Sequence, residues 1–145
     1  MSTQLAVGGI QITAPPGWAS ESFVDPNGLG IYRVASFQFP DDANDDTGQT
    51  ARALMQGSDI LINIIDFTVS DPDNTNDYYV PMTPPVIIDG SDAVGQEGYP
   101  LTVVAVIFGA WIFGRALYIS VSFGAEPSAA QVVAANAVLA TLAPA

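Results

Sequence analysis

The sequence of 145 residues contains no histidine, no lysine and no cysteine, and its only basic residues are Arg33, Arg52 and Arg115. Without histidine, no side chain has an unperturbed pKa near neutrality, so acid–base catalysis would need a carboxyl or phenol with a strongly shifted pKa. Ser–His–Asp and Cys–His catalysis, a catalytic lysine, and metal centres held by imidazole or thiolate are therefore excluded. What remains is a hard cation bound by oxygen ligands, or a pair of carboxylates acting on a sugar.

Acidic side chains dominate the charge of the chain. Fifteen Asp and Glu residues give a formal net charge of −12 at pH 7. Nucleic acid is a poor partner, because contacts to phosphates need Lys or Arg, and an anionic membrane surface is disfavoured for the same reason. The charge keeps in solution a chain that is 49% hydrophobic. The length suits one domain, residues 1–145, that buries its core without disulfides.

The longest apolar run, Leu101–Phe113, is too short to cross a bilayer as a helix, which requires roughly 20 residues. The apolar pattern resumes at Ala116–Phe123, where every second residue is polar or aromatic. Alternation of this kind is typical of a half-buried strand, so the two segments predict a β-hairpin and no membrane insertion. Residues 1–9 have neither a basic start nor a long apolar stretch, so no signal peptide is expected.

Further strands are predicted along the chain. Ile10–Ala14 alternates and ends at a Pro-Pro-Gly turn that precedes Trp18, a residue expected to close one end of the core. Ile31–Phe39 is a second strand candidate, and Ile60–Val69 is predicted to be central because its first half is apolar on both faces. Tyr78–Ile88 contains three prolines and is expected at a sheet edge as extended chain.

Two helices are predicted. Gln49–Gln56 has the composition of a short helix that ends at Gly57. After Pro127 and Ser128 the apolar period becomes helical, which predicts about four turns of helix. The apolar stripe consists of Val132, Ala135, Val138, Leu139 and Leu142. The fold class expected is α+β: an antiparallel β-sheet packed by a C-terminal α-helix and one short helix.

Three blocks of the sequence carry a resemblance: Ile10–Trp18, then Tyr32–Phe37 with Gly57–Ile62, and finally Gly114–Gly124 with Ala137–Leu142. The chain resembles small uncharacterised actinobacterial-type proteins that have an N-terminal P-x-G-W turn and a C-terminal V-L-x-[ST]-L helix. More distantly it resembles the Mog1/PsbP/DcrB-like α/β sandwich. The resemblance implies a sandwich fold and a role in binding, chaperoning or assembly, and it carries no catalytic motif.

Two acidic loops are candidates for a calcium site. Asp71, Asp73, Asn76 and Asp77 place oxygen-bearing side chains in a spacing that could surround a hard cation. The loop lacks the central glycine and closing glutamate of an EF-hand, so solvated turns are the alternative interpretation. A second cluster is formed by Asp41, Asp42, Asn44, Asp45 and Asp46. No other cofactor is expected.

Other candidate residues lie on the strands and at the edge segment. Asp66, in the apolar strand, is expected either to face solvent or to be buried beside Arg33 or Arg115 as a structural pair. A carboxylate pair acting on a sugar would draw on Glu21, Glu97 or Glu126, but nothing in the sequence sets their spacing. The candidate residues for a protein interface are Trp111, in a strand that is apolar on both sides, and Tyr78, Tyr79, Val80 and Met82, expected to be exposed.

The function expected from these features is non-enzymatic. One version is a protein-binding or assembly module that contributes to a repeating surface particle, such as a virion or cell envelope, which favours an extracytoplasmic or virion-surface location. A second version is a chaperone-like adaptor for an apolar client segment. A calcium- or glycan-dependent binding protein is the third alternative. In the first two versions the partner is another protein or a further copy of the chain.

Overall fold

The structure, a computed structural model, describes residues 2–39 and 48–145. Within these residues the chain forms two β-sheets, one longer helix and two short helical segments. The strands are β1 (Thr3–Leu5), β2 (Ile10–Ala14), β3 (Ala19–Val24), β4 (Gly30–Ala35), β5 (Ile60–Asp66), β6 (Tyr79–Pro81), β7 (Val94–Gly95), β8 (Val104–Ile112), β9 (Arg115–Phe123) and β10 (Ala143–Pro144). The helical segments are α1 (Gln49–Arg52), the 3-10 helix η1 (Gly90–Asp92) and α2 (Ala129–Leu139).

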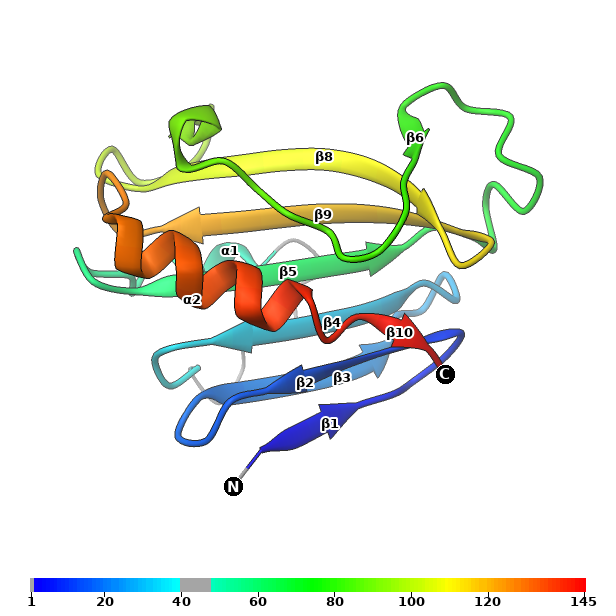
Figure 1. Cartoon of the computed structure of the whole chain (residues 1–145), viewed down its shortest axis with the longest axis horizontal. Helices are drawn as coiled ribbons and strands as arrows, with labels where there is room; N and C mark the ends of the chain where they lie inside the picture. Colours follow the sequence, from blue (N-terminus) through cyan, green and yellow to red (C-terminus); the bar gives the residue numbers. More distant parts are fainter. Residues whose placement is uncertain (1, 40–47) are drawn as a thin grey trace.

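The larger sheet has seven strands. Its order is β3-β4-β5-β9-β8-β6, and β7 also pairs with β8 (Figure 1). Neighbouring strands are antiparallel except β6, which runs parallel to β8. All residues of β5 are buried, which confirms its predicted central place. The predicted hairpin is also confirmed, since β8 and β9 pair from Val104 opposite Phe123 to Ile112 opposite Arg115.

The helix α2 and the three-stranded sheet β1-β2-β10 cover one face of the larger sheet (Figure 1). Ser128 caps α2 by accepting from the Gln131 N–H, while the Gln131 side chain accepts from the Ser128 N–H. Much of the predicted apolar stripe is buried here: Ala135, Val138, Leu139 and Leu142 enter the main core. The α+β fold with a helix across an antiparallel sheet is thus confirmed, although α2 has 11 residues rather than four full turns.

The opposite face of the large sheet carries two smaller apolar clusters. One joins Ala35, Phe37 and Phe39 to α1, and the other surrounds Ile31 and Ile65. The elements here are shorter than the sequence predicts, because β4 ends at Ala35 and the helix beginning at Gln49 ends at Arg52. The strands β1, β3 and β10 were not predicted at all. β3 is half-buried with no clear apolar alternation, so its pairing with β4 defines it more than its own pattern does.

Candidate functional site

The edge of the large sheet at β8 is only partly paired. Tyr79–Pro81 of β6 lies beside Gly109–Trp111, and Val94–Gly95 of β7 lies beside residues 105 and 104. Within the described part of the chain, no strand pairs with residues 106–108 on this edge. Two short strands that run in opposite directions therefore leave an open interval in the middle of β8.

The main-chain groups of Ile107 face this open interval. The Met82 N–H donates to the Trp111 carbonyl at 3.0 Å, so the peptide groups of Trp111 point away from β9 and toward the edge. Because alternate residues of a strand direct their N–H and C=O to the same side, those of Ile107 point to the same edge as those of Trp111. One donor and one acceptor thus stand between the ends of the β6 and β7 ladders.

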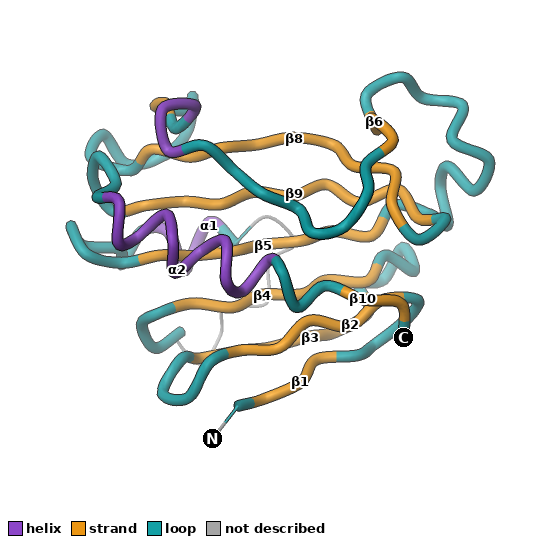
Figure 2. Tube along the Cα trace, in the orientation of Figure 1, coloured by secondary structure: helices purple, strands orange, loops and turns teal. Residues whose placement is uncertain are grey.

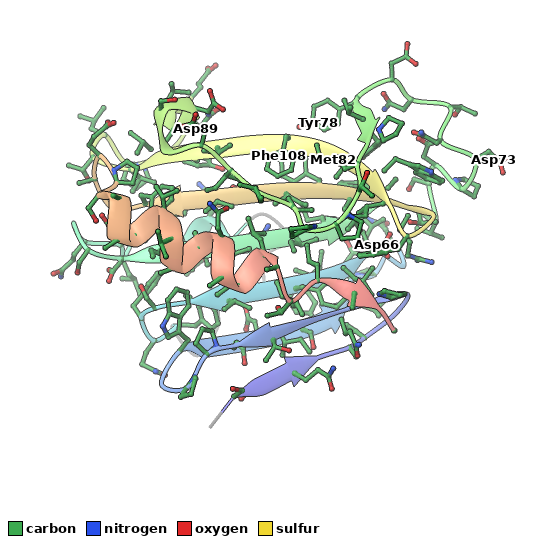
Figure 3. The ribbon with its side chains drawn as sticks, in the orientation of Figure 1. Asp66, Asp73, Tyr78, Met82, Asp89 and Phe108 are labelled. Atoms are coloured by element: carbon green, nitrogen blue, oxygen red, sulfur yellow. The ribbon has the colours of Figure 1, made fainter. Side chains whose placement is uncertain are left out.

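A groove of about 420 Å³ opens at the same place. Its walls come from β8, from β7 and η1, and from the segment of residues 82–89, here called the strap, which crosses from β6 to η1 (Figure 2). The apolar lining residues are Met82, Ile87, Ile88, Val94, Ala105, Val106, Ile107 and Phe108. Figure 3 shows Met82 and Phe108 close together at the strap and β8. The volume falls within the range of small-molecule binding sites, about 300–1,000 Å³.

The strap is hydrogen-bonded to the helix α2 through the side chain of Asn136. The Asn136 Oδ1 accepts from the Ile88 N–H at 2.8 Å, and the Asn136 Nδ2 donates to the Ile88 carbonyl at 3.1 Å. Val86 and Ile88 are buried in the main core, whereas Ile87 between them is 70% exposed. The strap is therefore fixed at both flanking residues while Ile87 is presented at the groove.

Exposed apolar side chains gather around the groove. Ile87 and Val94 line it directly, and Val94 is 55% exposed. Beyond the Met82 end of the groove, Tyr78, which precedes β6, is 45% exposed, and Val80 of β6 is 53% exposed. The ring of Tyr78 can lie against the sheet because Gly109 has no side chain; a Cβ there would come within 2.4 Å of the ring. Exposed apolar side chains grouped in this way are characteristic of a contact surface.

Two carboxylates stand at the η1 end of the groove. Asp89 and Asp92 are its charged lining residues in the part of the chain that the structure describes. The Ser91 N–H and hydroxyl both donate to Asp89 Oδ1, at 2.9 and 2.8 Å, and these bonds hold the pKa of Asp89 below its ordinary value. Asp89 therefore stays ionised at neutral pH, and this end of the groove is negative.

The five predicted interface residues all lie near this edge but differ in exposure. Tyr78 and Val80 are exposed as predicted, Met82 is half-buried and lines the groove, and Trp111 is half-buried on β8 opposite Pro81. The prediction for Tyr79 was wrong: it is only 8% exposed, because its side chain packs against Tyr78 and Phe67. Sequence reasoning missed Ile87 and Val94, whose only signal was apolar character beside a turn, and Phe108, which lies in the middle of the predicted hairpin strand.

The predicted calcium loop is held together by its own hydrogen bonds. Asp71 Oδ1 accepts from the N–H and hydroxyl of Thr75, its Oδ2 accepts from the Asn76 N–H, and these bonds lower the pKa of Asp71. Asn76 Oδ1 accepts from the Tyr78 N–H at 2.9 Å, while Asp73 and Asp77 are exposed, Asp73 pointing outward (Figure 3). Among the described residues no group of three or more acidic side chains is placed to hold a metal ion. The second acidic cluster, Asp41 to Asp46, lies outside the described residues.

Asp66 does not face solvent. It is 4% exposed, and its Oδ2 accepts from Arg115 Nε at 2.6 Å, while its Oδ1 accepts from the Thr68 N–H at 3.0 Å. The buried, structural alternative is therefore the correct one, with Arg115 as the partner. Arg33 instead pairs with Glu21 and donates to Asn63 Oδ1 at 2.9 Å across the large sheet.

Glu97 and Glu126, the other two glutamates named from the sequence, lie elsewhere than the Arg33–Glu21 pair. Glu97 lines a smaller hollow of about 230 Å³ with Tyr99, Tyr118 and Arg52, whose guanidinium lies 3.9 Å from the Tyr99 ring centre. Glu126 is exposed before α2. The three glutamates named from the sequence thus occupy three different places, and none lines the groove at β8.

Comparisons of this chain with protein-family models, with curated proteins and with solved structures found no match. In the part of the chain that the structure describes, none of the helices has the length and apolar character needed to cross a membrane. The candidate site therefore stands on its own geometry: an interrupted sheet edge, an apolar groove and an acidic rim.

Proposed function

We propose that this protein is a non-enzymatic protein-binding or assembly module whose contact surface is the β8 edge of the large sheet. The observation that carries the proposal is the coincidence, at one edge, of an apolar groove, four exposed apolar side chains and a stretch of β8 that no strand among the described residues pairs with. A sheet edge of this kind can accept an additional strand, whose main chain pairs with β8 and whose side chains enter the groove. The role in binding, chaperoning or assembly that the sequence resemblance implies agrees with this proposal.

Two versions of the function use the same edge. An adaptor would hold an apolar segment of a client protein, whereas a component of a repeating surface particle would receive a segment of the next copy. The groove favours a short extended segment in both versions, because 106–108 is an interval of three residues, about 10 Å at ~3.3 Å per residue. Such an interval holds one short strand between β6 and β7.

Substitutions at the exposed apolar residues test the function. An array of random eight-residue peptides is probed with the wild-type protein and with a variant that combines Val80→Asp and Ile87→Asp. We expect the variant to lose most of the binding seen with the wild type, since charge is introduced beside the groove. Val24→Asp is the control, because Val24 is 55% exposed, close to the 53% of Val80, but lies on β3 at the opposite edge.

Light scattering of the pure protein across protein and salt concentrations separates the two versions. The surface-particle version predicts self-association that the Val80 and Ile87 substitutions abolish. The adaptor version predicts a monomer that binds peptides. A monomer that binds no peptide on the array, or an equal loss in the Val24→Asp control, would contradict the proposed contact surface.

A further inference from the structure

We infer that the β8 edge binds an extended segment of a different protein, in which apolar residues alternate and one residue is Lys or Arg. This inference rests on the proposed protein-binding function and specifies the partner. It follows from three properties of the same place: the direction of the free main-chain groups, the apolar walls, and the sign of the charge at one end.

The main chain defines the conformation of the bound segment. Ile107 offers one N–H and one C=O between the β6 and β7 ladders, so a segment in line with these strands completes the edge with two hydrogen bonds. The alternating side chains of such a segment lie on opposite sides of the sheet. On one side they meet Met82 and Phe108, which pack against the main core, and on the other they lie near Ile107. Apolar residues at alternate positions fit these surroundings.

The charge defines the polar part of the segment. Asp89 and Asp92 line the groove at its η1 end, and the chain as a whole carries a net charge of −12. A cationic side chain on the bound segment pairs with these carboxylates, and a carboxylate at the same position is repelled. The partner is therefore basic or neutral at this position.

A second copy of this chain is a poor occupant because it cannot supply the cation. The chain has no lysine, and its three arginines already have partners. Arg33 is buried beside Glu21 and Asn63, Arg52 is buried against Tyr99, and Arg115 pairs with Asp66. Two copies also repel each other through their net charge. The charge thus favours a separate, basic partner over self-assembly at this edge.

Labelled synthetic peptides test the inference directly. The probes are eight-residue peptides in which Val and Thr alternate and one central position is Lys, Gln or Glu, and binding is measured by fluorescence anisotropy. We expect the Lys peptide to bind roughly five- to thirtyfold more tightly than the Glu peptide at low salt, with Gln between them. Added NaCl should reduce this difference, because it screens exposed charges.

Two substitutions assign the binding to the groove. Ile107→Pro removes the N–H that faces the open edge, and a strand tolerates proline at an edge position of this kind. The substitution should weaken the binding of all three peptides about fivefold or more. Ile107→Val keeps the N–H and should bind like the wild type. Asp92→Asn should reduce the preference for Lys over Gln, whereas Asp73→Asn, which removes an equal charge from a distant exposed loop, should not.

The outcomes separate this inference from the proposed function. Equal binding of the Lys and Glu peptides, with loss in Ile107→Pro, overturns the basic partner but leaves the protein-binding edge in place. Self-association that Ile107→Pro abolishes likewise overturns the separate partner and supports assembly. Binding of none of the peptides, or binding that Ile107→Pro does not change while thermal unfolding shows an intact fold, overturns the inference and removes the edge as the contact surface.

Discussion

Removing the side chain of Asn136 is predicted to release the strap from α2 and to destabilise the fold. Asn136 is the residue that satisfies both main-chain groups of Ile88, through bonds of 2.8 and 3.1 Å. Ile88 is only 5% exposed, so water does not readily replace the lost partners. In Asn136→Ala one buried N–H and one buried C=O are left without hydrogen bonds.

The magnitude follows from these two groups. A buried main-chain group that loses its partner costs about 1–3 kcal/mol. The strap can instead move outward, and this alternative sets the upper limit of the loss in stability. The movement exposes Ile88, which costs about 1.5–3 kcal/mol of apolar burial, and it also breaks the remaining contacts of the strap. We therefore expect Asn136→Ala to lower the free energy of unfolding by about 2–4 kcal/mol. Affinity for a peptide at the β8 edge should fall as well, because the strap forms one wall of the groove.

Denaturant unfolding measures the stability, and amide hydrogen exchange at Ile88 measures the release of the strap. Asn136→Asp separates the two hydrogen bonds, since it can still accept from the Ile88 N–H but cannot donate to the carbonyl; exchange at Ile88 should remain slow. Val133→Ala is the control on the same helix, because Val133 is 68% exposed, and it should change stability by less than about 0.5 kcal/mol. A loss of under about 0.5 kcal/mol in Asn136→Ala, with unchanged exchange at Ile88, would refute this account of the strap.

Two further predictions concern the loops outside the groove. Gly124→Ala should destabilise the fold by about 1–3 kcal/mol or prevent folding, because the added Cβ would lie 1.6 Å from the Gln56 carbonyl oxygen. The control is Gly57→Ala, whose added Cβ meets nothing within 4 Å and should be tolerated. Equal thermal unfolding of the two variants would contradict the close packing of Gly124 against Gln56. The pKa of Asp71 is lower in the folded protein than in the unfolded chain, so its ionised form stabilises the fold. This contribution is fully present above the pKa of the unfolded chain, at about pH 4, and is lost as the pH falls through the pKa of the folded protein. The free energy of unfolding, measured by urea titration, should therefore fall less between neutral pH and about pH 3 in Asp71→Asn than in the wild type. An unchanged pH dependence would show that the hydrogen bonds accepted by Asp71 do not favour its charged form.

Much of the architecture follows from local patterns that need no tertiary information. The alternation in Ala116–Phe123, the doubly apolar start of β5 and the helical period after Ser128 predict the hairpin, the central strand and the covering helix. These patterns succeed because each element buries a face that its own sequence defines. Elements whose burial depends on a neighbour escape such reasoning, as β1, β3 and β10 show.

The candidate site divides along the same line. The sequence by itself determined which side chains are available for a site. The chain is acidic and contains no lysine or histidine, and its proline-containing segment, expected at a sheet edge, carries apolar side chains. Only the tertiary structure decided that β6 and β7 stop on either side of residues 106–108, that the strap places Ile87 outward and Ile88 inward, and that Tyr79 is buried while Tyr78 is not. Pairing between segments far apart in the chain, together with the Asn136 contact to Ile88, sets these details, and neither leaves a local pattern in the sequence.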